Sequence, residues 1–120
     1  MRPVDLLVRL EWLAVLVAAI FIYAAIGGSW LLFAVLILAP DLSMAGYAGG
    51  PRIGAAVYNL FHTLAGPALL AFASHFGLGS WMLPVALIWL AHIAADRMLG
   101  YGLKLPTGFR DTHMGRIGRD

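Results

Sequence analysis

Four long apolar stretches constrain the fold of this chain more than any other feature. A helix that crosses the roughly 30 Å hydrocarbon core of a bilayer needs about 20 apolar residues. Such segments run from about residue 4 to 26, from 29 to 39 with a continuation to about 45, from 53 to 73, and from 80 to 99. Hydrophobic residues make up 62% of the 120, and charged residues only 12%. The sequence therefore predicts an all-α membrane protein, with a four-transmembrane-helix antiparallel bundle at residues 1–99 and a short basic tail at 100–120.

Proline and glycine interrupt two of these segments. Pro40 and Asp41 follow the second apolar run, so its crossing depends on the continuation to about residue 45. Gly66 and Pro67 predict a kink in the third segment. Pro84 falls in or near the first turn of the fourth, where a helix tolerates it.

The basic residues predict the orientation of the bundle. Four crossings place both termini, the loop 43–52 and the tail on one side of the membrane. All eight Lys and Arg residues then lie on or near that side: Arg2, Arg9, Arg52, Arg97, Lys104, Arg110, Arg116 and Arg119. Because positively charged loops stay inside, we expect a multi-pass protein of the cell (inner or plasma) membrane with cytoplasmic termini. Asp5 and Glu11 argue against reading the first segment as a cleaved signal peptide.

Polar side chains within the apolar segments fall at one depth. Counting 1.5 Å per residue from the opposite side, they lie at roughly 18 to 23 Å: Glu11, Asp41, Asn59, His62, His92 and Asp96. Ionisable residues inside spanning segments are expensive and are by default hypotheses of a functional site. His92 and Asp96 stand four apart, on one helix face. Glu11 shares a stripe with the small residues Ala14, Ala18 and Ala25, so we expect its carboxylate to face protein.

The first interpretation of this set is a metal site. Imidazoles and carboxylates bind zinc, manganese or iron, and helical bundles build such sites from inward-facing side chains. The predicted ligands are Glu11, Asp41, His62, His92 and Asp96. Glu11, Asp41, His92 and Asp96 would also act in catalysis, by metal-assisted hydrolysis or transfer on an amphiphilic substrate. Tyr58, Asn59, Arg97 and His113 would surround or cover the ligands.

Two other interpretations use the same residues. In the first they form a structural clasp in an assembly or interaction subunit, with Glu11 or Asp41 paired to Arg97 or Arg9 and the histidines bonded across helices. A homo-oligomer or another membrane protein would then be the partner. In the second they line a proton or ion path, although the opposite half of the helices offers no polar residue to continue it.

The tail mixes cations with apolar side chains, which favours contact with anionic lipid headgroups; a disordered tail is the alternative. Folded back as a lid, it would bring Asp111 and His113 towards the site, and Lys104, Arg110 and Arg116 to a phosphate or headgroup.

The absence of cysteine excludes disulfides and thiolate ligands. Scattered cations without a groove-reading element argue against nucleic acid.

Several motifs resemble a family of small bacterial and archaeal membrane proteins described as domain of unknown function 4260. They are Arg9-Leu-Glu11, Pro40-Asp-Leu-Ser43, Gly46-Tyr47, Tyr58-Asn59-x-x-His62 and the stretch from His92 to Gly118. The resemblance covers nearly the whole chain and implies a multi-spanning membrane protein, without an activity. Thr112-His113 and His92-x-x-x-Asp96 are also similar to motifs of membrane-bound metal-dependent hydrolases.

Overall fold

A computed structural model describes residues 2–117, which contain six helices. These are α1 (Pro3–Ala25), α2 (Trp30–Leu36), the 3-10 helix η1 (Ala39–Gly49), α3 (Pro51–His62), α4 (Ala65–Ser74) and α5 (Met82–Leu99). Taken with their continuations they give four spans of sufficient length and hydropathy to cross a membrane: Pro3–Ala25, Trp30–Gly49, Pro51–Ser74 and Met82–Leu99. The predicted four-span, all-helical architecture is confirmed.

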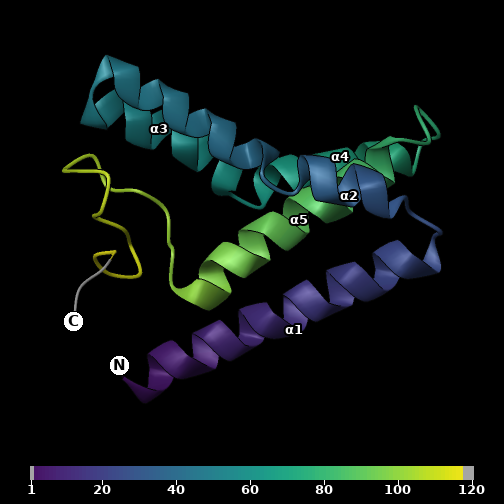
Figure 1. The fold of residues 1–120 in the computed structure, drawn as a ribbon, viewed down its shortest axis with the longest axis horizontal. Helices are drawn as coiled ribbons and strands as arrows, with labels where there is room; N and C mark the ends of the chain where they lie inside the picture. The colour runs from purple at the N-terminus through teal and green to yellow at the C-terminus, as the bar shows by residue number, and fades with distance from the viewer. Residues whose placement is uncertain (1, 118–120) are drawn as a thin grey trace.

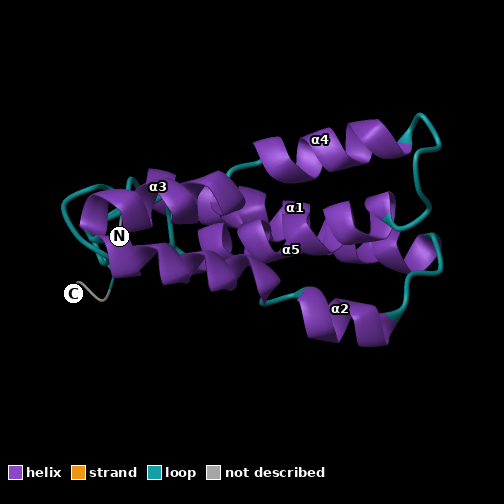
Figure 2. Ribbon diagram, turned by 90° about the horizontal axis from the view of Figure 1, so that it is seen from above, coloured by secondary structure: helices purple, strands orange, loops and turns teal. Residues whose placement is uncertain are grey.

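The spans run in alternating directions (Figure 1). α1 and α5 pack against each other along their lengths, and α1 begins where α5 ends. We call this the terminal end of the bundle, because it holds Arg2 and the tail; the opposite end, with the turns at residues 26–29 and 75–81, is the hairpin end. Figure 2 shows that α2 and α4 lie on opposite sides of the α1–α5 pair.

The buried face of α1 differs from the predicted stripe. Trp12, Leu16, Ala19 and Tyr23 recur at alternating spacings of four and three, and Ala19 and Tyr23 are buried. Residues of the predicted stripe are exposed instead: Glu11, Ala14, Ala18 and Ala25. That expectation was wrong because the large ring of Tyr23, which packs with Leu87 and Ile88 of α5, offers more contact area than a row of alanines and so determines which face of α1 is buried.

Aromatic packing closes the hairpin end. The ring of Tyr23 contacts those of Trp30 and Phe33, with centroids 5.2 and 5.3 Å away. Its hydroxyl donates to the carbonyl of Ser29 at 2.5 Å. The same ring packs with Leu87 and Ile88 of α5 in the apolar core. Side-chain packing therefore joins α1, α2 and α5 at this end.

Both middle spans are broken, and a proline accounts for each break. A proline ring conflicts with the carbonyl four residues earlier and removes one helical hydrogen bond. Four residues before Pro40 stands Leu36, where α2 ends. Four residues before Pro67 stands Thr63, which is extended (φ −94°, ψ 160°) and separates α3 from α4. The kink expected at Gly66-Pro67 is therefore a full break, displaced towards the preceding helix.

η1 carries the second span to Gly49, beyond the predicted limit near residue 45. Gly50 then turns the chain with φ +101°, a conformation that favours glycine. Gly54 lies against the ring of Tyr47, where a β-carbon would overlap the ring. This close approach lets η1 pack along α3 at the terminal end.

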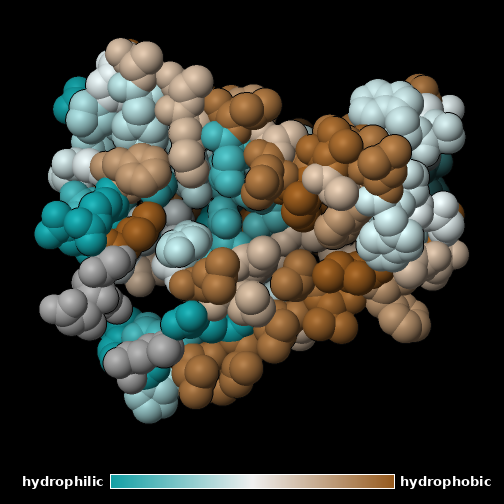
Figure 3. Space-filling view, in the orientation of Figure 1, coloured by the Kyte–Doolittle hydropathy of each residue, from teal (hydrophilic) through white to brown (hydrophobic). Residues whose placement is uncertain are grey.

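The surface agrees with a lipid environment. Large apolar side chains point outwards along the first three spans, among them Phe21, Leu31 and Phe72. In Figure 3 hydrophobic residues cover the visible length of α1 beyond its first turns, and hydrophilic residues gather at the terminal end. The chain is therefore built as a multi-pass membrane protein.

Candidate metal centre

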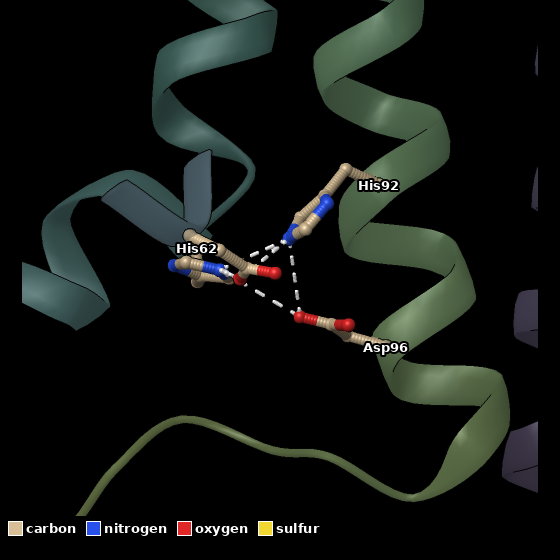
Figure 4. A group of neighbouring side chains, drawn as sticks. His62, His92 and Asp96 are labelled. Atoms are coloured by element: carbon tan, nitrogen blue, oxygen red, sulfur yellow. Dashed lines mark hydrogen bonds and ion pairs between the residues drawn. The ribbon is translucent and has the colours of Figure 1, made fainter. Parts of the chain in front are cut away.

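The two breaks bring ligand-bearing residues to one point beside α5. Asp41 lies just after the first break, and His62 is the last residue of α3 before the second. The unbroken α5 presents His92 and Asp96 one turn apart (Figure 4). One potential ligand atom from each of these four residues lies within 4.8 Å of all the others.

Three of the four atoms form a nearly equilateral triangle. The Nε2 atoms of His62 and His92 are 3.2 Å apart, and each is 3.1 Å from Oδ1 of Asp41. Oδ2 of Asp96 stands farther off, 3.6 Å from Nε2 of His62 and 3.4 Å from Nε2 of His92. Both imidazoles are buried, whereas the side chain of Asp41 is 33% exposed. The open side of the group is therefore at Asp41.

Backbone carbonyls determine which nitrogen of each imidazole faces the group. Nδ1 of His62 lies 2.8 Å from the carbonyl oxygen of Tyr58, and Nδ1 of His92 lies 2.5 Å from that of Ile37. A carbonyl can only accept, so each Nδ1 carries a proton and donates it. In a neutral imidazole the Nε2 atom is then left with a lone pair. Ile37 can receive this bond because the break before Pro40 removes the helical partner of its carbonyl.

Four electron-pair donors consequently face one another. A proton on one Nε2 can form a hydrogen bond between only two of these atoms, whereas a metal ion can be bound by all four. Ligands at roughly 2.0–2.2 Å from a tetrahedral metal lie about 3.3–3.6 Å from one another. Five of the six separations here run from 3.1 to 3.6 Å, and the sixth, between Asp41 and Asp96, is within 4.8 Å. The group is therefore close to the spacing of ligands around a tetrahedral cation. Donation of each Nδ1–H to a carbonyl is also the usual support of a metal-bound histidine.

Arg97 and Trp89 satisfy the carbonyls that the second break exposes. Nη2 of the buried Arg97 donates to the carbonyl of His62 at 2.6 Å, and Nη1 donates to that of Tyr101 at 2.8 Å. The indole Nε1 of Trp89 donates to the carbonyl of Phe61 at 2.7 Å. Within residues 2–117 the hydrogen bonds of Arg97 thus run to backbone carbonyls and not to a carboxylate.

Tyr58 and Asn59 extend the group towards the tail. The ring of Tyr58 stacks on His62 with centroids 3.7 Å apart, and its hydroxyl donates to Oδ2 of Asp96 at 3.4 Å. The side-chain amide of Asn59 donates to the carbonyl of Lys104 at 2.8 Å and accepts from its N–H at 2.6 Å. The predicted surrounding residues Tyr58 and Asn59 therefore do lie beside the ligands, and Asn59 ties the tail to α3.

The family model described as "Domain of unknown function (DUF4260)" matches residues 5–117. The chain belongs to this family. The match includes all four clustered residues and the tail segment that Asn59 binds. Neither the comparison with curated proteins nor that with solved structures gives a match. For this DUF4260 chain, function must be argued from the site itself.

Glu11 and the predicted lid residues lie apart from the cluster. Glu11 is exposed on α1, on a face turned away from α5. Nδ1 of His113 accepts the N–H of Leu103 at 2.7 Å, and burial, with the charge of Arg97, lowers the pKa of His113. Asp111 accepts from the hydroxyl of Thr107 at 2.7 Å. The tail of this DUF4260 chain does fold back, but Asp111 and His113 fasten the tail to itself and are not in the ligand group.

The terminal end also contains a cavity of about 1150 Å³ between α1, α5 and the tail. Four arginines are among its lining residues: Arg2, Arg9, Arg97 and Arg116. Arg2 is paired with Asp5 at 2.9 Å, and Arg9 donates to the carbonyl of Met98 at 2.6 Å. Positive charge therefore gathers around this opening, next to the helix that carries His92 and Asp96.

Proposed function

We propose that this DUF4260 chain holds one divalent metal ion between Asp41, His62, His92 and Asp96, and uses it for hydrolysis or group transfer on an amphiphilic substrate. The convergence of four electron-pair donors, with both imidazoles oriented by carbonyls, is the observation that supports it most strongly. Two nitrogens and two oxygens at tetrahedral spacing favour zinc. The triangle of two histidines and one carboxylate also suits iron(II), and manganese accepts the same ligands.

The unequal distances support different roles for the two carboxylates. Asp41, His62 and His92 form the closer triangle, and three protein ligands with one open position are typical of catalytic metal sites. Such an ion lowers the pKa of a bound water towards neutrality and makes it a nucleophile. Asp96 stands farther off and receives a hydrogen bond from Tyr58. It is placed either to complete the coordination or to accept the proton of that water.

The apolar surroundings support an amphiphilic substrate. A pocket of about 210 Å³ lies next to the ligands, and its lining includes Pro40, Phe61, Ile88 and Trp89. Pro40 and Phe61 directly precede the ligands Asp41 and His62 in the chain. An acyl or other apolar chain in this pocket would leave its polar part at the exposed side of Asp41. The arginines of the terminal end favour an orientation with this side in the cytoplasm.

Metal analysis of the purified protein tests the proposal. The wild type should contain close to one zinc, iron or manganese ion per chain, and His92→Ala should lose it while its helical circular dichroism is retained. His75→Ala is the matched control, because His75 is an exposed histidine at the hairpin end. A wild type that takes up no metal, together with a loss of stability in His92→Ala, would instead support the clasp.

A further inference from the structure

We infer that the metal-loaded centre binds a phosphate group and that Lys104 is the cation that receives it. This inference rests on the proposed metal centre and names the anion that such a centre would take. The phosphate is carried either by a lipid headgroup or by a small soluble molecule.

Lys104 is held in place more firmly than a tail residue usually is. The side-chain amide of Asn59 donates to the backbone carbonyl of Lys104 and accepts from its backbone N–H. An isolated antiparallel bridge joins it to Thr112, so the segment folds back on itself. Lys104 is only 3% exposed. The backbone of Lys104 is therefore held against α3, and its side chain is buried at the terminal end.

The ammonium of Lys104 lies against two aromatic rings, one of which belongs to Tyr58 beside the cluster. Nζ lies 3.8 Å from the ring centroid of Phe109 and 4.9 Å from that of Tyr58. Tyr58 in turn stacks on His62 and donates to Asp96. Burial lowers the pKa of Lys104, while the negative charges of Asp96 and Asp41 act against this shift. Lys104 therefore interacts electrostatically with both carboxylates and contacts aromatic rings, which bind cations without neutralising them.

The charges around the cluster balance only in the absence of metal. The two partly exposed carboxylates of Asp41 and Asp96 are matched in number by the buried cations of Lys104 and Arg97. A divalent ion would then leave two positive charges uncompensated at the cluster, where the metal would be the largest local charge. A phosphate monoester dianion has the opposite charge of the same size. Its several acceptor oxygens can contact the metal and the three N–H donors of a lysine together.

This balance predicts a reciprocal coupling between metal and phosphate. Each ligand should tighten the binding of the other by the same factor, since linkage is symmetric for binding. We expect a factor of about ten, within the usual range for coupled sites. Full-length protein in phosphatidylcholine nanodiscs would be titrated with Co²⁺, whose visible absorption reports its ligands, at constant ionic strength with and without inorganic phosphate. A second set of nanodiscs would contain 20 mol% phosphatidic acid instead.

Substitution of Lys104 gives a result that a merely structural lysine would not give. Lys104→Met keeps an apolar stem against the rings and removes the charge. It should strengthen Co²⁺ binding without phosphate several-fold, because a repelling charge is gone, and reduce the phosphate effect below about twofold. Lys104→Arg should retain the coupling. Arg110→Met is the control, because it removes a cation from an exposed position of the same tail.

The outcomes separate this inference from the proposed function. Coupling to inorganic phosphate in neutral nanodiscs supports a soluble phosphate, and coupling only to phosphatidic acid supports a lipid headgroup. Co²⁺ binding that neither form of phosphate changes overturns the inference and leaves the metal centre standing. A weaker Co²⁺ affinity in Lys104→Met, with an unchanged phosphate effect, overturns it as well. Failure of the wild type to bind any metal removes both proposals.

Discussion

The two halves of the bundle are held together by different means, although α5 runs through both. At the hairpin end, Tyr23, Leu87 and Ile88 form an apolar core with neighbouring aromatic rings. At the terminal end the middle spans are broken, and side chains of α5 bind the backbone that the breaks expose. Broken helices at membrane depth persist only where protein or a cavity satisfies them. The breaks therefore belong to the site, and the intact half serves as its support.

Replacing a carboxylate of the cluster should have the largest effect. Asp41→Ala removes the oxygen that lies 3.1 Å from both imidazoles, so metal affinity should fall at least about 100-fold. Glu11→Ala removes an exposed carboxylate outside the cluster and should leave affinity unchanged within about twofold. Isothermal titration with zinc in detergent measures both. Equal losses in the two variants would mean that the cluster is not the binding site.

Repairing a break should weaken the site without removing any ligand. Pro67→Ala allows the third span to continue through Thr63, which would turn His62 out of its position beside Asp41. We expect metal affinity to fall by about tenfold, a cost in the usual range for positioning residues. Zinc titration tests this, with Pro84→Ala in the first turn of α5 as the control. Unchanged affinity in Pro67→Ala would show that the break does not position His62.

A substitution at the hairpin end should affect stability alone. Tyr23→Phe removes the hydrogen bond to the carbonyl of Ser29 but keeps the ring in its aromatic contacts. The free energy of unfolding should decrease by about 1 kcal/mol, with no change in metal content. Unfolding in mixed detergent and denaturant, followed by metal analysis of the folded fraction, checks both halves of this expectation. A change in metal content would show that the two ends are coupled.

The smallest effect concerns acidification of the tail. The pKa of His113 is lowered in the folded tail, chiefly by burial and then by the charge of Arg97. The folded tail thus binds fewer protons than the released tail. The stabilisation that His113 gives the folded tail is fully present above the ordinary value of 6.5 and is lost as the pH falls through the folded pKa. The protection factor of the Leu103 amide, taken relative to its intrinsic exchange rate, should decrease at acidic pH in the wild type and less in His113→Gln.

Sequence patterns located the His/Asp cluster but not its fine structure. Depth along the four segments predicted that Asp41, His62, His92 and Asp96 would meet, because depth depends only on helix rise. Depth says nothing of the rotation of a helix about its axis, and the stripe of alanines used for α1 wrongly turned Glu11 towards the interior. The rotation of α1 depends instead on the packing of Tyr23 with Leu87 and Ile88 of α5, and the helical spacing of Trp12, Leu16, Ala19 and Tyr23 was the signal for it.

The orientation of the imidazoles lay outside sequence reasoning for a different reason. The carbonyls of Ile37 and Tyr58 that fix them are backbone groups, and no residue type marks them. One signal was present: the clash of a proline with the carbonyl four residues earlier places the breaks at Leu36 and Thr63. Applied to Pro40 and Pro67, this rule finds both helix ends that flank the site.

X-ray absorption spectroscopy of the zinc-loaded protein tests the metal centre most directly. The account predicts a first shell of nitrogen and oxygen only, at about 2.0–2.1 Å, with the outer-shell scattering of two imidazoles. His62→Ala and His92→Ala should each reduce that scattering by one ring or abolish binding. A spectrum of bound zinc without imidazole scattering would contradict the account, because then the ion would lie elsewhere than between His62 and His92.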